Sequence, residues 1–205
     1  MEEIGLEPEH GRHVARLALV LFDGLAPLHG LGLRERHLLH AGALVHDVGM
    51  SVADRGHHKR SYHLIARHSF RHWKSREVGF VALLARYHRK AAPNIKHGKY
   101  SALPRRDREA ILRLSAILRL ADGLDSAHLS TVQGIDVSCE GETVRLRLRA
   151  ERDCGAEIWG AERKADLFES VFSRRLCIEA ANGRRPTENR ALEEGGNYPH
   201  VEQLA

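Results

Sequence analysis

Histidine and aspartate side chains occur in this chain at positions where a buried helix would carry apolar residues. The segment LLHAGALVHDVG (38–49) is apolar over most of its length, yet it contains His46 and Asp47. An unpaired charge is costly to bury, so such groups need either a partner or a metal ion. Other parts of the chain must supply that partner.

Three further residues of the same chemical types lie on predicted apolar helix faces. His10, His88 and Asp122 each stand four residues from an apolar side chain of the same predicted helix, and residues at that spacing share a face. Taken singly, each histidine is more often a hydrogen-bonded core residue, and each aspartate can bond to a helix end or turn. Taken together, imidazoles and carboxylates are a ligand set for Zn, Fe, Mn or Co, and an aspartate can bridge two such ions.

The elements that position these residues are predicted to be mainly α-helical. The pattern indicates helices over 8–25, 34–49, 57–73, 76–90 and 105–125, strands over 134–139, 143–150, 156–159 and 175–181, and an amphipathic helix over 161–172. In the second strand, apolar residues alternate with arginines, which is typical of a strand with one buried face.

The same pattern divides the chain into three parts. We expect a helical domain over 1–130 and a small α+β subdomain over 131–182. The segment 183–205 is rich in Gly, Asn and Glu, which favours a disordered tail. A chain of 205 residues is long enough for one good core with such an appendage.

Composition restricts the classes of function. The net charge is +5 and the isoelectric point about 9.4, a mild excess that favours anionic ligands without requiring nucleic acid. Cys139, Cys154 and Cys177 form no CxxC pair, which argues against a zinc ribbon or a disulfide framework. The N-terminal segment has no signal-peptide pattern, and no apolar run approaches the roughly 20 residues of a membrane span. We therefore expect a cytoplasmic protein with no membrane partner.

The residues that could bind metal resemble a known signature. His10, the His46-Asp47 pair and Asp122 are similar to the H…HD…D motif of the HD-domain metal-dependent phosphohydrolases. The resemblance implies an HD-domain helical bundle with the small C-terminal α+β appendage. It also implies one or two divalent ions, which the sequence leaves open among Mn, Fe, Co, Zn, Ni and Mg.

Members of that superfamily with a second metal site add two histidines between the HD pair and the final aspartate. In this sequence the segments GHHKRS and RYHRK occupy those places. The second segment supplies His88. In the first, either His57 or His58 could be the ligand, and His57 is favoured by its offset from Ser61.

A closer resemblance covers residues 8 to 180. The segments GHHKRSYHLIARH, ARYHRKAAP, LSAILRLADGLDSAHL and EIWGAERKADLFESVFSRRL are similar to the C-terminal half of the exopolyphosphatase/guanosine pentaphosphate phosphatase (Ppx/GppA) family. In that family the exopolyphosphatase chemistry belongs to two N-terminal actin-like domains. We expect this chain to be the HD portion standing alone, so the resemblance implies the metal site and not that activity.

The implied chemistry is hydrolysis of a phosphate ester or anhydride by a metal-activated water. Asp47 would bridge the two ions. The candidate catalytic residues are Asp47, Lys59 and Asp125. Asp125, one turn after Asp122, could hydrogen-bond a ligand or the nucleophile, or it could cap the end of the helix.

Four basic residues beside these ligands are candidates for binding substrate phosphates, namely Lys59, Arg60, Arg89 and Lys90. Singly, each is about as well explained as a solvated helix end. The implied ligand is a phosphorylated small molecule or a polyphosphate. Nothing in the sequence distinguishes nucleotides, nucleoside polyphosphates and polyphosphate.

Two alternatives stay open. The domain could be a non-catalytic regulatory module that binds polyphosphate or guanosine polyphosphates and works with a partner that carries the actin-like phosphatase domains. Nucleic-acid binding through Arg145, Arg147 and Arg149 is weaker, because no aromatic residues are interleaved with them. A homodimer is compatible with a compact helical domain.

The remaining histidines show no coherent spacing. We expect them to be surface or incidental residues: His13, His29, His37, His40, His63, His97, His128 and His200.

Overall fold

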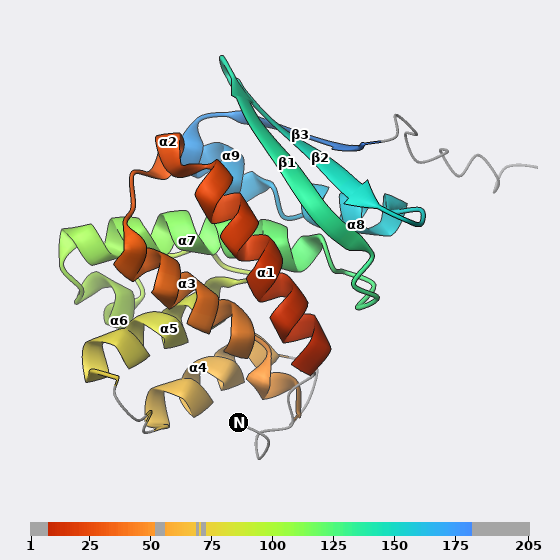
Figure 1. Cartoon of the computed structure of the whole chain (residues 1–205). Coiled ribbons are helices and arrows are strands. Elements are labelled where there is room, and N and C mark those ends of the chain that lie inside the picture. The colour runs from red at the N-terminus through yellow and green to blue at the C-terminus, as the bar shows by residue number, and fades with distance from the viewer. Residues whose placement is uncertain (1–7, 52–55, 69, 71–72, 182–205) are drawn as a thin grey trace, which may run out of the picture.

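The computed structural model describes residues 8–51, 56–68, 70 and 73–181. The elements follow in the order α1 (Pro8–Gly24), α2 (Ala26–His29), α3 (Leu33–Val45), the 3₁₀ helix η1 (Val48–Ser51), α4 (His57–Arg67), α5 (Ser75–Tyr87), α6 (Gly98–Ser101), α7 (Arg105–Gly123), β1 (Val132–Glu140), β2 (Thr143–Ala150), α8 (Gly155–Glu162), α9 (Asp166–Phe172) and β3 (Arg175–Ala180). This confirms the predicted fold class, mainly α-helical with a small C-terminal α+β appendage (Figure 1).

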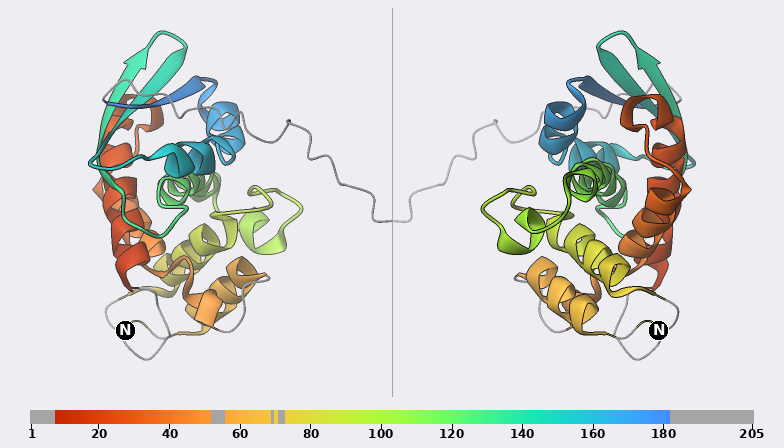
Figure 2. Two further views of the ribbon diagram at one scale, coloured as in Figure 1. Left: turned by 90° about the vertical axis from the view of Figure 1, so that its right-hand side faces the viewer. Right: turned by 90° about the vertical axis from the view of Figure 1, so that its left-hand side faces the viewer.

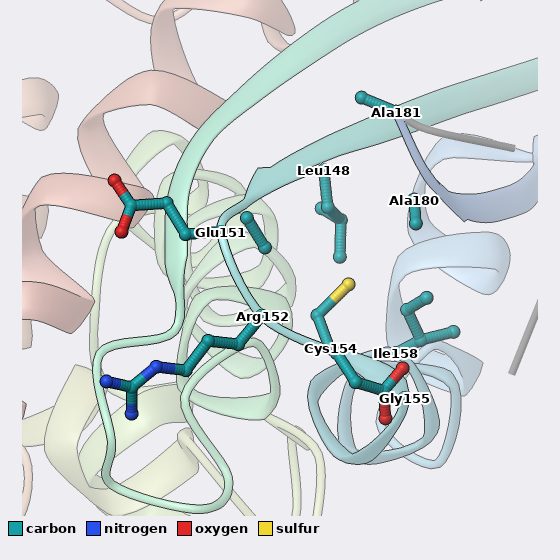
Figure 3. A pocket seen from close by; sticks show the side chains of 10 residues that line it. Leu148, Glu151, Arg152, Cys154, Gly155, Ile158, Ala180 and Ala181 are labelled. Carbon is teal, nitrogen blue, oxygen red and sulfur yellow. The ribbon is translucent and has the colours of Figure 1, made fainter. Parts of the chain in front are cut away.

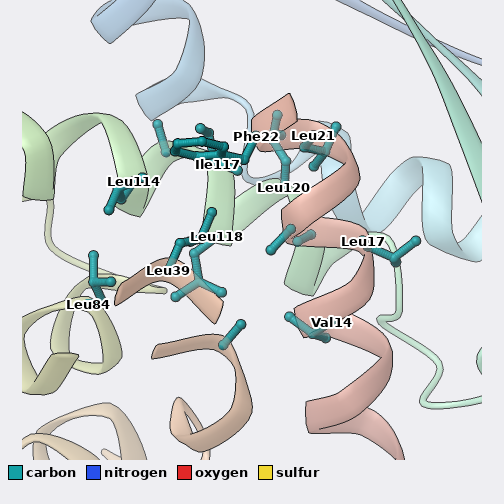
Figure 4. Close-up of a cluster of buried hydrophobic side chains, with 14 of the residues drawn as sticks. Val14, Leu17, Leu21, Phe22, Leu39, Leu84, Leu114, Ile117, Leu118 and Leu120 are labelled. Atoms are coloured by element: carbon teal, nitrogen blue, oxygen red, sulfur yellow. The ribbon is translucent and has the colours of Figure 1, made fainter. Parts of the chain in front are cut away.

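Helix α7 is the central element. Every residue from 114 to 123 is buried, as expected for a helix that is covered on all sides. It packs against α1, α3 and α5 in the helical part and against α8 and α9 in the appendage. Figure 4 shows side chains of α1, α3, α5 and α7, among them Leu17, Leu39, Leu84 and Leu118, meeting in this interior. Helix α7 is therefore the element that these five helices share as a packing partner.

The appendage contains a three-stranded sheet in the order β1-β2-β3. Strand β2 is antiparallel to β1 and parallel to β3, and α8 and α9 form the crossover that a parallel pair requires. Val144, Leu146 and Leu148 are buried, so the predicted alternation along this strand is confirmed. Both views in Figure 2 place the sheet and α4 at opposite ends of the molecule.

One predicted strand is wrong. Residues 156–159 lie in helix α8, whose buried face includes Glu157, Ile158 and Ala161. A four-residue apolar run cannot by its periodicity be told from one turn of a buried helix. The amphipathic helix predicted over 161–172 is in turn divided, because α8 ends at Glu162 and α9 begins at Asp166.

Two predicted helices are shorter than expected. The helix predicted over 34–49 ends at Val45, so His46 and Asp47 lie in the turn that precedes η1. The helix predicted over 57–73 ends at Arg67, where His68 adopts an extended conformation. Residues 69, 71 and 72, and the predicted disordered tail over 183–205, lie outside the described residues.

The division of the chain near residue 130 stays a prediction. One apolar core extends from α1 and α7 into β2 and α9 without interruption.

Cys139, Cys154 and Cys177 are free thiols. None of the described helices combines the length and apolar character that a membrane span requires.

Of the two alternatives given for His29, a surface or an incidental residue, the first is wrong, because His29 is buried at the end of α2. Its Nε2–H donates to the carbonyl oxygen of Phe22 at 2.7 Å, and its Nδ1 accepts the N–H of Leu31 at 2.9 Å. The second contact requires the neutral imidazole, because a protonated Nδ1 cannot accept. Burial lowers the pKa of His29, and the nearby Arg113 lowers it further. His13 is also buried, whereas His37, His40 and His63 are exposed as expected.

We expect the free energy of unfolding to decrease as the pH falls below the ordinary histidine pKa of about 6.5. The reason is that the unfolded chain binds a proton at residue 29 that the folded chain excludes. His29→Gln can still donate and accept hydrogen bonds, and we expect its free energy of unfolding at pH 7.5 to be lower by about 1 kcal/mol. Between pH 7.5 and pH 5.5, its free energy of unfolding should decrease by less than that of the unsubstituted protein. Urea unfolding at both pH values measures this. The exposed His63→Gln is the control, and an unchanged pH dependence in His29→Gln would contradict the assignment.

Candidate metal centre

Five helix ends or turns bring their histidine and aspartate side chains to one point. Asp47 is the most accessible of them, with a side chain that is 20% exposed, and the other members are buried. The residues are His10 from α1, His46 and Asp47 from the turn after α3, His57 from the first turn of α4, His88 from the C-terminal cap of α5, and Asp122 from the last turn of α7. We call these six residues the metal cluster.

One side of the metal cluster contains two imidazoles and two carboxylates. Nε2 of His10 and Nε2 of His46 lie 3.6 and 3.7 Å from Oδ1 of Asp122. Oδ2 of Asp47 lies 3.5 Å from Nε2 of His46 and 3.9 Å from Nε2 of His10. Ligand atoms that are each about 2.1 Å from one ion are separated by about 3 to 4 Å, so these distances fit a shared cation.

The other oxygen of Asp47 faces a second pair of imidazoles. Oδ1 lies 3.2 Å from Nε2 of His57 and 3.2 Å from Nε2 of His88. The two Nε2 atoms are 3.3 Å apart. Asp47 therefore stands between two groups of nitrogen ligands, with one oxygen toward each, as a bridging carboxylate does.

Hydrogen bonds on the outer side fix the orientation of three of the rings. Nδ1 of His10 lies 2.7 Å from Oδ2 of Asp125, and Nδ1 of His46 and of His88 lie 2.7 and 2.8 Å from the carbonyl oxygens of Ala43 and Ala85. An imidazole that donates from Nδ1 directs the lone pair of Nε2 inward, which is the arrangement found in metal-binding histidines.

The inward atoms include acceptors without a donor. Within the described residues, Nε2 of His10, Nε2 of His46 and Oδ1 of Asp47 are buried and make no hydrogen bond. Buried polar atoms are normally paired, and acceptors that face one another repel. The donor set and its geometry thus fit a divalent cation.

The ionisation of the metal cluster agrees with that role. Burial alone would raise the pKa of Asp122, but Lys164 and the imidazoles of His10 and His46 hold it well below its usual range. Burial, together with the neighbouring His46, lowers the pKa of His88 to about 3, so this ring is neutral. The imidazoles of His46 and His88 lower the pKa of Asp47 against the effect of burial, so both carboxylates are ionised and His88 can offer a lone pair. Burial lowers the pKa of His46, but Asp47 and Asp122 outweigh burial and raise it.

His10 differs from His88 because two carboxylates surround it. Burial lowers its pKa, but the neighbouring carboxylates of Asp122 and Asp125 outweigh burial and raise it to about 9. Binding of a cation at Nε2 must therefore release this proton. Asp125, which is fully buried, also accepts the backbone N–H of Ser130 at 2.8 Å. Of the two roles left open for Asp125, the structure shows the hydrogen bond to a candidate ligand.

The structure also separates the two candidates in the GHHKRS segment. His57 contacts Asp47 and His88, as described above. The ring of His58 stands at 89° to that of His57, with centroids 6.0 Å apart, and burial and Arg86 lower its pKa to about 4. The close packing that places His57 involves Gly49, because a Cβ there would lie 2.5 Å from the carbonyl oxygen of His57.

Of the four basic candidates, Arg89 reaches the metal cluster. Its guanidinium donates to Nε2 of His57 at 3.3 Å. Lys59 and Lys90 are exposed, and Arg60 is half-buried. Lys59 lies in the first turn of α4, next in sequence to His58, with its side chain exposed.

Three residues near the metal cluster escaped the sequence analysis. Lys164 donates to Oδ2 of Asp122 at 2.6 Å. The ring of His128 stacks on that of His10 at 3.9 Å, with 2° between the planes, although His128 is exposed as expected. Arg119 donates to the carbonyl oxygens of Tyr87 and Lys90 and so holds the chain on both sides of His88. Its spacing of three residues before Asp122 was the available signal.

A separate cavity of 530 Å³ lies where β2 ends and α8 begins. Figure 3 shows Leu148, Cys154 and Ile158 among its lining side chains. It shares no residue with the metal cluster. We therefore assign the chemistry to the cluster and not to this cavity.

The family model for the Ppx/GppA phosphatase, domain III, matches residues 1–157. The chain belongs to the Ppx/GppA family. The matched region includes every residue of the metal cluster, from His10 to Asp122, together with Asp125 and Arg89. Lys164 lies outside it. The predicted resemblance to the C-terminal part of this phosphatase family is confirmed.

We expect metal analysis of the purified protein, after growth with Mn²⁺, to find about two divalent ions per chain, as in two-metal hydrolytic sites. Asp47→Ala should lose both, because its two oxygens face both groups of imidazoles. His57→Ala should lose no more than one. Elemental analysis by mass spectrometry measures this, with His63→Ala as a surface control. Retention of full metal content in Asp47→Ala would show that Asp47 is not the bridge.

Proposed function

We propose that this chain is an HD-type, metal-dependent phosphohydrolase that hydrolyses a phosphate ester or anhydride. The observation that carries the proposal is the metal cluster, in which buried imidazole lone pairs and ionised carboxylates face one another. A purely structural interior has no need for acceptors arranged in this way. Membership of a phosphatase family supports hydrolysis as the class of reaction.

The residues have separate roles in this proposal. His10, His46 and Asp122 would hold one divalent ion and His57 and His88 would hold a second, with Asp47 between the two groups. Ions held there supply a water of lowered pKa and polarise a phosphoryl oxygen. Mn, Fe, Co, Zn, Ni and Mg all remain candidates.

Asp125 acts in this proposal as a positioning residue. Because it is fully buried and hydrogen-bonded to Nδ1 of His10, it orients that ligand and does not itself meet the substrate. Loss of a hydrogen-bond partner of a metal ligand typically lowers metal affinity or activity by about 10- to 100-fold. Arg89, beside His57, is placed to bind a phosphate oxygen of the substrate.

Nucleic acid remains the weaker candidate ligand. The arginines of β2 are paired, since Arg145 and Arg147 contact Glu179 at 3.1 and 2.9 Å and Arg149 lies 3.5 Å from Asp136. Their charge is therefore partly offset within the sheet. This pairing supports a small phosphorylated ligand or polyphosphate at the metal cluster.

The test is release of inorganic phosphate by the Mn²⁺-loaded protein from p-nitrophenyl phosphate, pyrophosphate, tripolyphosphate and GTP. We expect turnover of at least one substrate and a loss of about 100-fold or more in Asp122→Asn, because a ligand of the activating ion is weakened. His63→Ala should retain full activity. Equal turnover in Asp122→Asn would show that the activity comes from a contaminant.

A different result would favour the regulatory alternative. If the metal-loaded protein binds tripolyphosphate or GTP but releases no phosphate from any of the four compounds, the chain is a binding module. In that case its partner would carry the phosphatase domains.

A further inference from the structure

Lys164 places a positive charge directly against a residue of the metal cluster. Its Nζ donates to Oδ2 of Asp122 at 2.6 Å, while Oδ1 of the same carboxylate faces the Nε2 atoms of His10 and His46. The Lys164 side chain is 29% exposed and that of Asp122 is 10% exposed. Lys164 thus lies between the buried ligands and solvent.

The close contact between α7 and α8 brings Lys164 near Asp122. A Cβ at Gly123 would lie 2.6 Å from Cα of Ala161, and a Cβ at Gly160 would lie 2.6 Å from the carbonyl oxygen of Gly123. Only residues without a side chain permit this close approach of the two helices. The separation of the helix axes at this point is therefore set by the two glycines.

The break between α8 and α9 then directs the side chain. The N–H of Lys164 donates to the carbonyl oxygen of Ala161 at 3.0 Å, and the N–H of Ala165 donates to that of Glu162 at 3.1 Å. These bonds span three residues and tighten the end of α8, so that Lys164 lies in the turn beside the last turn of α7. A continuous helix over 161–172, as predicted from the sequence, would not have this turn.

We infer that Lys164 binds the substrate phosphate at the metal cluster. An ammonium has three N–H donors, and within the described residues Asp122 accepts one of them. A partly exposed lysine can present the others to a phosphoryl oxygen. Negative charge on that oxygen is stabilised by a fixed cation next to a metal ligand. This role rests on the proposed function. Lys164 itself lies outside the residues that the family model matches.

The role also explains why the appendage accompanies the helical part. Arg89 approaches the cluster at His57, on the side of Asp47 away from Asp122, whereas Lys164 approaches it at Asp122. Anions bound at the cluster would thus meet a cation from α5 at one end and a cation from the α8–α9 turn at the other. Of these two described cations, Arg89 belongs to the helical part and Lys164 to the appendage.

The experiment measures metal content and phosphate affinity separately. Inorganic phosphate is titrated into the Mn²⁺-loaded full chain, with binding followed by calorimetry and by paramagnetic broadening of the ³¹P signal. We expect Lys164→Met to retain its Mn²⁺ and to bind phosphate about tenfold more weakly, the loss expected for one hydrogen bond to a charged group. Lys164→Arg should recover part of the affinity. Lys99→Met, at an exposed lysine of α6, should match the unsubstituted protein.

Three results would overturn the inference. Unchanged phosphate affinity in Lys164→Met would show that Lys164 does not contact the anion. Loss of Mn²⁺ from both Lys164→Met and Lys164→Gln, the second neutral variant, would show that it acts only by holding Asp122. An unsubstituted protein that holds no Mn²⁺ would contradict the proposed function itself, and this inference with it. Metal content thus distinguishes the two failures.

Discussion

The repulsion between buried acceptors is the constraint on which the rest of the structure depends. Asp47 and Asp122 bring two negative charges to a point toward which the imidazoles of His10, His46 and His88 direct their Nε2 atoms. In the interior such an arrangement is costly unless a cation lies within it. Lys164 and a His10 whose pKa is raised to about 9 offset part of this cost.

The helical scaffold serves to hold these acceptors in place. Three of the helix ends that carry ligands, those of α3, α5 and α7, are C-terminal, where backbone carbonyl groups lack partners within the helix and can accept the N–H of a histidine. His10 and His57 instead lie in the first turns of α1 and α4. His46 and His88 use this device in the same way, each bonding to a carbonyl oxygen three residues earlier. Helix α7 connects the end of α5 with Asp122. Its Arg119 donates to the carbonyl oxygens on both sides of His88, and Asp122 follows Arg119 one turn later. Residues 114–123 of α7, between these ends, are all buried.

Much of this could be predicted from the sequence, because the signal was local. A charged or imidazole group four residues from an apolar one indicates an inward position, and this reasoning found His10, His88 and Asp122. Lys164 could not be found in this way, since its approach to Asp122 depends on the glycine contact between two helices about 40 residues apart in sequence. The strand predicted over 156–159 failed for a related reason. Whether a short apolar run pairs with a strand or packs on α7 is decided by tertiary contacts.

The most direct test of the metal cluster is X-ray diffraction from crystals grown with Mn²⁺, with data collected at the manganese absorption edge. We expect an anomalous peak on each side of Asp47, one next to His10, His46 and Asp122 and the other next to His57 and His88. A map with no anomalous peak among these residues, and with ordered waters bonded to the Nε2 atoms instead, would contradict the assignment of a metal centre.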